Sequence, residues 1–472
     1  MKTYIKIITA ALLLPLFPMV TSCDIDKIQP ENQLLTDNAI RDEASAQYIL
    51  NGIYDSGRDF SLSSFPLYLA AYGNEGRISG QLSGGTGFNT NAVPADNQFL
   101  TNLYNGHYKI INLSNFLIQN LEAGKAVGIS ETRKNEMLSE AKFQRAFAYF
   151  NLVRYFGQFY DMNSTYGVVI RTEFSKVIEA KPRNTVQEVY DLIYADLDFA
   201  AANGPTFVEH FYSGSLAAKA LLAKVELYRG NYSEAAALAD EVINNIEGYE
   251  LETSYANIFS NSFNSSEVIF APFSGPNAEG GSTMDFINRT TYSNALELLA
   301  DSQVGAANDG VLTGSGSNYD PRFSFAYSAS TKGFNSQGKY PFQNNTLSQN
   351  NTMYHLRLGE IYLIQAEAEA RRVGGDLDLA TSLLNDIRFR ANVTLKTFSD
   401  KPTLLEDIRQ EKLLELFYEN GEPWFDLVRY HTLGDLDALA VKPTLTNVNQ
   451  FILPIPLQVI IGNNTVIPNP GY

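Results

Sequence analysis

The sequence predicts a mainly α-helical protein in which stacked helical hairpins form an α-solenoid core, with a long loop-rich insert and few short strands. The first observation is that a helical hairpin pattern with small residues at fixed offsets occurs twice, in residues 215–247 and 357–391. The second is that residues 249–352, between the two, have few helix signals. The third is composition: 44% of the 472 residues are hydrophobic, which excludes global disorder.

Residues 1–22 have the pattern of a signal peptide. Lys2 and Lys6 provide a positively charged start, and residues 7–20 are apolar. That apolar stretch is shorter than the ~20 residues that a membrane-spanning helix needs. We therefore expect residues 1–22 to be removed after export.

The single cysteine, Cys23, directly follows the predicted signal peptide. The run Val-Thr-Ser-Cys resembles a bacterial lipobox, in which the cysteine sulfur takes a diacylglyceryl group and its freed amino group is acylated. Several acyl chains give durable membrane anchoring, whereas a structural thiol is the alternative reading. We expect residues 23–35 to be a lipidated tether and residues 36–472 to be a single domain.

Helical hairpins are expected near residues 36–54, 136–157, 185–247 and 357–430. Thr36 and Asp37 are the expected cap of the first helix, and a Thr185…Glu188 capping box begins another. Tetratricopeptide-type offsets are met by Leu222, Ala223, Gly230, Tyr232, Ala235, Ala368, Gly375 and Ala380. Glu226 and Arg371 depart from this pattern, because an aromatic residue usually stands there.

Two regions, 56–105 and 249–352, have the composition of loops that bind ligands. They are rich in Tyr, Phe, Asn, Gly and Ser, and flat aromatic faces with amides and charges suit sugar rings. Strands are expected only at residues 166–170, 266–273 and 450–456. The candidate ligand-binding residues in these regions are Tyr72, Asn74, Arg77, Phe88, Tyr292, Asn294, Tyr319 and Arg322.

Several function classes are excluded or unsupported. The net charge of −17 opposes binding to nucleic acid. No catalytic motif occurs, and the four histidines, His107, His210, His355 and His431, lack metal-ligand spacing. We therefore expect no enzyme and no cofactor, although a structural calcium site remains an alternative.

Three carboxylate patterns have plainer interpretations than catalysis. Asp196 and Asp198 point to different sides of a helix, and capping accounts for the pair at 376 and 378. Glu411, Glu415 and Glu419, spaced four residues apart, predict a solvated helix face.

The chain resembles the SusD/RagB family of nutrient-binding outer-membrane lipoproteins of Bacteroidetes. The resemblance covers essentially the whole mature chain and ends in the terminal Asn-Pro-Gly-Tyr run. Its strongest segments are residues 140–157, 185–200, 215–235, 357–371, 383–391, 408–430 and 451–472. Pro423 departs from the family pattern, since relatives usually place an Arg before the Trp-Phe-Asp-Leu run.

The resemblance implies four tetratricopeptide-like hairpins packed against a loop-rich half, and no catalysis. It also implies an outer-membrane, cell-surface lipoprotein that captures an oligosaccharide and delivers it to a SusC-like TonB-dependent barrel. A peptide-binding RagB-like importer component and a tetratricopeptide-type protein scaffold are the alternatives. Relatives bind ligands with the same two regions of the chain. No binding motif transfers residue by residue, so the candidate residues above are assigned by region.

Overall fold

The structure is a computed structural model that describes residues 38–78, 84–177, 179–275, 290–303, 320–326, 338–341 and 351–472. Residues 40–472 form one compact unit. The predicted signal peptide, Cys23 and the predicted tether lie outside the described residues.

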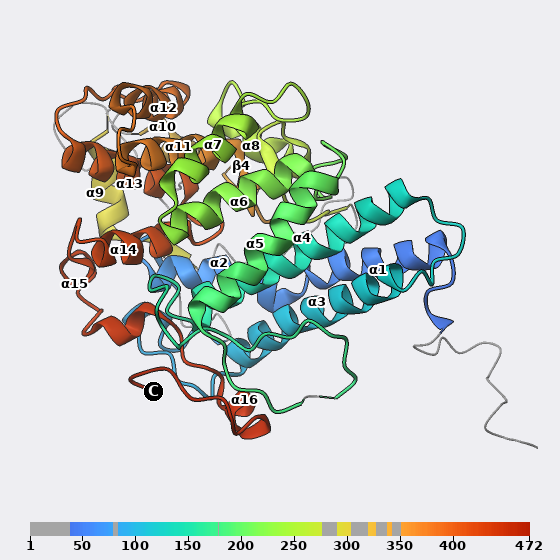
Figure 1. Cartoon of the computed structure of the whole chain (residues 1–472). Coiled ribbons are helices and arrows are strands. Elements are labelled where there is room, and N and C mark those ends of the chain that lie inside the picture. Colours follow the sequence, from blue (N-terminus) through green and yellow to red (C-terminus); the bar gives the residue numbers. More distant parts are fainter. Residues whose placement is uncertain are drawn as a thin grey trace, which may run out of the picture. The chain divides into compact units, whose positions relative to one another are not determined.

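The predicted helical solenoid is confirmed (Figure 1). Its helices are α4 (Glu131–Phe156), α5 (Val186–Asn203), α6 (Ser215–Arg229), α7 (Tyr232–Ile243), α11 (Leu358–Arg371), α12 (Leu377–Arg390), α13 (Lys401–Leu416) and α14 (Glu422–Thr432). Each helix packs against the next one in this series. Helices α7 and α11 pack together although the whole insert separates them in the sequence. The chain therefore leaves the stack to form the insert and then returns to it.

Local sequence signals set the boundaries of these hairpins. Gly230 ends α6 with φ 78°, a left-handed conformation that glycine adopts without strain. Asp376 caps α12 by accepting a hydrogen bond from the amide of Leu379, which is the role predicted for the carboxylates at 376 and 378. Thr185 and Glu188 form the expected capping box of α5. Pro423 lies in the first turn of α14, where its missing amide hydrogen breaks no helical hydrogen bond.

Three helices precede the solenoid and pack against α4 or one another: α1 (Glu43–Ser56), α2 (Phe60–Tyr72) and α3 (Gln98–Glu122). The expected cap of α1 was placed too early, because Asp42 caps the helix together with Ser45. Helix α3 was not predicted. The loop predicted at residues 56–105 is also corrected, since α2 lies inside it. Because α2 is buried on nearly all sides, it has no apolar stripe for periodicity to reveal.

The insert contains short elements: α8 (Tyr255–Ser260), η4 (Ser262–Asn264), β2 (Val268–Phe270), β3 (Thr290–Tyr292), α9 (Asn294–Asp301) and α10 (Pro321–Ala326). Strand β2 pairs antiparallel with β4 (Leu356–Arg357), and β3 pairs antiparallel with β1 (Gly76–Ile78). The remaining elements are η3 (Phe88–Thr90), α15 (Ala438–Val441), η7 (Val448–Phe451) and α16 (Leu457–Gly462).

Of the three expected strands, only 266–273 is confirmed, by β2. Residues 166–170 exchange just two backbone hydrogen bonds with Asn184, too few to extend a ladder. Residues 450–456 begin in η7, and prolines at 454 and 456 have no amide hydrogen to donate to a sheet.

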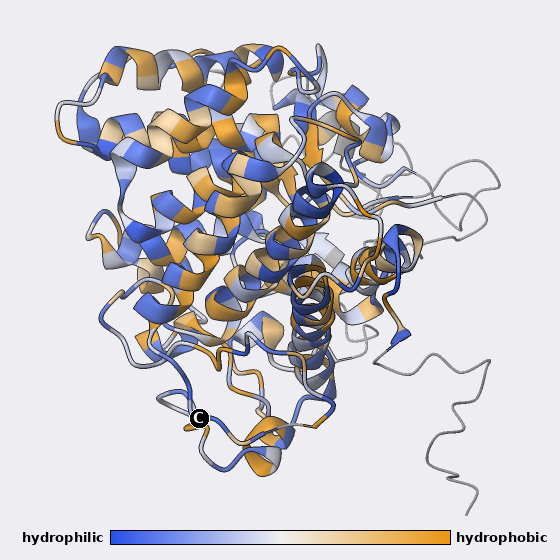
Figure 2. Ribbon diagram, turned by 45° about the vertical axis from the view of Figure 1, so that its right-hand side comes forward, coloured by the Kyte–Doolittle hydropathy of each residue, from blue (hydrophilic) through white to orange (hydrophobic). Residues whose placement is uncertain are grey.

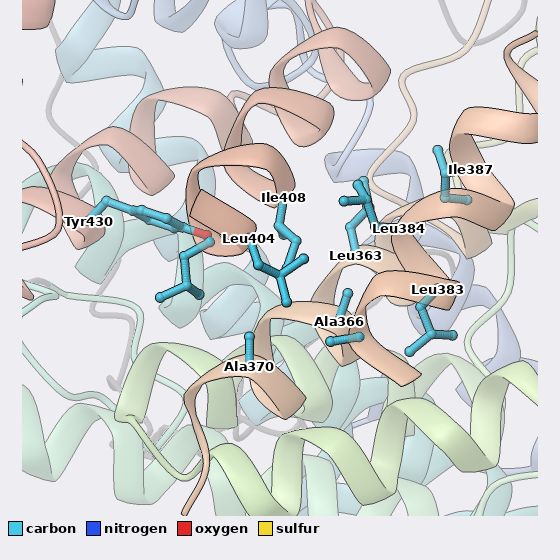
Figure 3. Close-up of a cluster of buried hydrophobic side chains, with 11 residues drawn as sticks. Leu363, Ala366, Ala370, Leu383, Leu384, Ile387, Leu404, Ile408 and Tyr430 are labelled. Atoms are coloured by element: carbon cyan, nitrogen blue, oxygen red, sulfur yellow. The ribbon is translucent and has the colours of Figure 1, made fainter. Parts of the chain in front are cut away.

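The solenoid core lies where α11, α12, α13 and α14 meet (Figure 3). Leu363, Ala366, Ala370, Leu383, Leu384, Ile387, Leu404, Ile408 and Tyr430 are among its buried residues. Alanines on α11 allow close helix approach, as the hairpin pattern predicts. Figure 2 shows hydrophobic and hydrophilic residues alternating along most helices, the pattern of helices packed on one face.

Candidate functional site

Strand pairing brings the two predicted ligand-binding regions together. Strand β1, from region 56–105, aligns with β3, from region 249–352, so that Gly76 faces Tyr292 and Arg77 faces Thr291. Side chains directly opposite each other on paired strands lie on the same face of the sheet. The sheet therefore places Arg77 beside Thr291.

Gly76 is required by close packing beneath this sheet. A Cβ at Gly76 would lie 1.5 Å from the hydroxyl oxygen of Tyr418. That hydroxyl donates to the carbonyl of Thr291 at 3.0 Å. Tyr418 thus holds β3 from below at the point where β1 has no side chain.

Hydrogen bonds at both ends fix the sheet. Asn89 clamps the end of β1, because its amide group exchanges two 2.8 Å hydrogen bonds with the backbone of Ile78. At the other end, the Ser293 hydroxyl donates to the carbonyl of Asn74 at 2.6 Å and its amide donates to that of Glu75. Ser293 also caps α9. Side-chain hydrogen bonds therefore hold the β1–β3 pair in place at both ends.

Four polar residues in or beside this sheet are at least partly exposed, and together we call them the β1–β3 surface: Arg77 and Thr291 in the strands, Asn74 before β1 and Asn294 at the start of α9. Arg77, Thr291 and Asn294 are exposed and Asn74 is half-buried. Guanidinium, hydroxyl and amide groups together supply donors and acceptors that sugar hydroxyls can use. Three of the eight candidate residues thus lie together here.

Three of the four aromatic candidates, the ones among the described residues, lie in the core. Tyr72 and Phe88 are fully buried, and Tyr292 is 6% exposed. Tyr72 packs edge-on against Trp424 at 4.9 Å, and Tyr292 packs against Phe323 at 5.6 Å. These rings support the sheet in this structure and do not offer a flat face to a ligand. Trp424 is buried, as its structural interpretation predicts.

Arg322 is also buried, and Tyr319 lies outside the described residues. The Arg322 guanidinium donates to Asp320, Glu411 and Glu415, each at 2.7 Å. Its charge is therefore used within the fold, which corrects the expectation that it reaches a ligand.

The carboxylates expected to form a solvated helix face are buried, so that prediction was wrong; two of them lie on α13 and Glu419 follows its end. Glu411, Glu415 and Glu419 are all completely buried. They pair with a set of cations from the insert, β4 and α12: Arg322, Lys339, Arg357, Arg388 and Arg390. Four-residue spacing places Glu411 and Glu415 on one face of α13 but does not say whether water or arginine covers that face.

One ionisable group lies directly under the β1–β3 surface. Glu75 is completely buried, and its Oε2 accepts from the Tyr418 amide at 2.6 Å. Its Oε1 has no hydrogen-bond partner among the described residues. Burial raises the pKa of Glu75 to about 7, although the Tyr418 amide and the charge of Lys339 act in the opposite direction.

Sequence reasoning missed Thr291, Asn89, Ser293 and Glu75. Nothing in a three-residue strand indicates its partner, so the role of Thr291 depends on long-range pairing. Within the described residues, no three His, Cys, Asp or Glu side chains are grouped so that they could hold a metal ion. In the same part of the chain, no helix has the length and apolarity to cross a membrane.

Comparison with known families matches two parts of the chain. Residues 289–472 match the SusD family, and residues 27–227 match a SusD-like family described as starch-binding and associating with the outer membrane. The two matches include β1, β3 and most of the solenoid, whereas α7 lies in the stretch between them.

Individual relatives align over most or all of the chain. A SusD-like protein P2 of Formosa agariphila is 27% identical, with both chains fully covered. A SusD-like protein of Bacteroides ovatus is 25% identical over 73% of this chain and 68% of its own.

Solved structures share the fold. A SusD superfamily protein of Bacteroides thetaiotaomicron is 26% identical with a TM-score of 0.73, covering 90% of this chain and 99% of its own. A laminarin-binding SusD-like protein is 25% identical with a TM-score of 0.68, covering 92% of this chain and all of its own.

Proposed function

Because the chain belongs to the SusD/RagB family, we propose that it is a cell-surface lipoprotein that captures an oligosaccharide at the β1–β3 surface. It then delivers the sugar to a SusC-like TonB-dependent barrel in the outer membrane. The observation that carries the binding proposal is the β1–β3 pairing, which joins both predicted ligand regions in one surface.

The chemistry of this surface suits neutral sugar hydroxyls. Arg77 and the amide of Asn294 supply donors, and Thr291 and Asn74 supply oxygen acceptors, all from backbone positions fixed by Asn89 and Ser293. Such preorganisation lowers the entropy cost of binding. The laminarin-binding protein supports glycans as the ligand class.

Lipid anchoring at Cys23 fits the same function. A sugar bound by an anchored protein stays at the membrane, close to its transporter, which raises the effective concentration at the barrel. The lipobox of residues 20–23 is the sequence feature that supports this anchor.

The test is calorimetric titration of a chain that begins at residue 24, which keeps the whole compact unit of residues 40–472. The probes are laminarin, starch and host-type oligosaccharides, with peptides included. We expect saturable glycan binding that falls at least tenfold in Arg77→Ala and Asn294→Ala. The matched control is Arg41→Ala, because Arg41 is exposed and lies outside the β1–β3 surface. Heat released only by peptides would favour a peptide importer and overturn the glycan proposal.

Delivery is tested with the full-length lipidated chain in membranes. Co-purification of an outer-membrane barrel is expected, and Cys23→Ala should release the protein from the membrane fraction. Capture of soluble protein partners in place of a barrel would favour the scaffold alternative.

A further inference from the structure

A separate cavity of about 420 Å³ lies among α1, α2, α3, α4, α6 and the β2–β4 sheet. Its volume falls in the ~300–1,000 Å³ range of small-molecule sites. The residues of the β1–β3 surface do not line it. Helix α2 contributes Leu62 and Pro66, and Pro66 has no amide hydrogen with which to bond the Leu62 carbonyl.

Unpaired polar atoms on two helices line this cavity. His107 of α3 is 4% exposed, and neither Nδ1 nor Nε2 has a hydrogen-bond partner among the described residues. Gln144 of α4 is also 4% exposed, and its Nε2 donor is likewise unpaired. Buried polar groups are nearly always hydrogen-bonded, so these atoms indicate a partner that the described residues do not supply.

Aromatic rings form the walls and the mouth. Inside, the half-buried His355 ring packs against Phe147 at 4.8 Å and Phe270 at 5.7 Å. At the mouth, the half-buried rings of Tyr54 and Tyr212 meet at 5.1 Å. Flat apolar faces combined with a few unpaired polar atoms suit a ring that has C–H faces and a hydroxylated edge.

The charged side chains that line the cavity are already paired. Lys224 contacts Glu360 and Glu422, and Arg154 contacts Glu422 at 3.2 Å. At the mouth, Arg58 pairs with Asp55 at 2.5 Å. A charged ligand would have to break one of these ion pairs, so an uncharged ligand fits better.

Both histidines of the cavity are neutral. Burial, helped by the charge of Arg154, lowers the pKa of His107 to about 3. Burial and the neighbouring positive groups lower the pKa of His355 to about 3 as well. A neutral imidazole has one donor and one acceptor, which is the pair that a hydroxyl group can satisfy.

We propose that this cavity is a second binding site, which takes one uncharged hydroxylated ring, such as a single neutral sugar unit. His107 and Gln144 hydrogen-bond its hydroxyls, and the aromatic rings pack on its faces. The site goes beyond the β1–β3 surface and works independently of it.

The experiment titrates glucose, galactose and mannose, with glucuronic acid and glucosamine as charged comparisons, against the chain that begins at residue 24. We expect saturable binding of at least one neutral sugar and at least tenfold weaker binding of its charged analogue. His107→Phe keeps a ring of similar size and removes both unpaired nitrogens, so binding should fall at least tenfold. Arg77→Ala should leave this binding unchanged, which separates the two sites.

Thermal unfolding without sugar provides a second readout. If His107 serves a ligand, His107→Phe should raise the Tm of the free protein and abolish the sugar-induced Tm shift. If a buried water molecule hydrogen-bonds to His107 instead, the same variant should lower the Tm and no neutral sugar should bind. That result would overturn the proposal. Gln144→Leu repeats the test should His107→Phe fail to fold. His431→Phe, outside the cavity, is the control for binding.

Discussion

Arg322 donates a hydrogen bond from Nη1 to Oε1 of Glu411 across 2.7 Å, and both side chains are completely sheltered from water. The same nitrogen also donates to Glu415 at 2.7 Å. These contacts join residues 320–326 of the insert to α13 of the solenoid. The insert is therefore attached to the core through charge as well as through apolar packing.

Replacing Arg322 with Met should lower the free energy of unfolding by about 3–5 kcal/mol, because Glu411 and Glu415 would lose a cation while remaining buried. Urea unfolding measures this change. Arg41→Met, at an exposed position, is the control and should stay within about 0.5 kcal/mol of the unaltered protein. A loss below about 1 kcal/mol for Arg322→Met would show that the other cations of the cluster compensate.

Gly76→Ala should disrupt the β1–β3 surface, because the new Cβ would lie 1.5 Å from the Tyr418 hydroxyl. Overpacking of this kind costs about 1–3 kcal/mol, and we expect glycan binding at this surface to weaken with it. Thermal unfolding and calorimetry measure the two effects. Gly52→Ala is the matched control: Gly52 lies in α1 with open space around it, so alanine should stabilise the protein by about 0.5–1 kcal/mol. Equal behaviour of the two variants would contradict the close packing described here.

Leu384→Ala should cost about 2–5 kcal/mol, because Leu384 is fully buried where α11, α12 and α13 meet (Figure 3). The loss has two parts, the transfer of the missing methyl groups and the cavity that they leave. Leu395→Ala is the control, since that leucine is 50% exposed. Chemical denaturation of both variants provides the comparison, and similar midpoints would argue against a packed core at this position.

Much of the solenoid was predictable because its signals are local. Gly230 and Asp376 define hairpin turns through their own backbone and side-chain chemistry, and the Thr185…Glu188 box does the same for α5. Helix α2 was missed for the opposite reason: it is buried all round, so its sequence lacks the polar face that marks an amphipathic helix.

The sequence supports the candidate surface by region and not by residue. Composition pointed to the two regions that hold Arg77 and Asn294, but it could not tell exposed rings from buried ones, as Tyr72 and Phe88 show. That distinction depends on contacts far apart in sequence, such as Tyr72 with Trp424. Arg322 illustrates the same limit for charge, since its partners lie on α13.

Glu75 offers a pH-dependent test of the packing beneath the β1–β3 surface. Burial raises the pKa of this carboxyl from 4.5 to about 7 in the folded protein, whereas the unfolded chain keeps the ordinary value. Between these two pH values the folded state holds a proton that the unfolded state has released. The contribution of Glu75 to stability is therefore fully present below pH ~4.5 and is lost as the pH rises toward ~7.

Glu75→Gln should remove this dependence, because the amide is neutral at every pH and its oxygen can still accept from the Tyr418 amide. The difference in unfolding free energy between the variant and the unaltered protein should grow in favour of the variant by about 1.4 kcal/mol per pH unit over that interval. Urea unfolding at several pH values between 4 and 8 measures it.

Glu140, whose pKa burial also raises to about 7, is present in both proteins and cancels in the difference. The exposed Glu247, changed to Gln, should give a curve parallel to that of the unaltered protein. A flat difference for Glu75→Gln would mean that water or a cation reaches the carboxylate in the folded state.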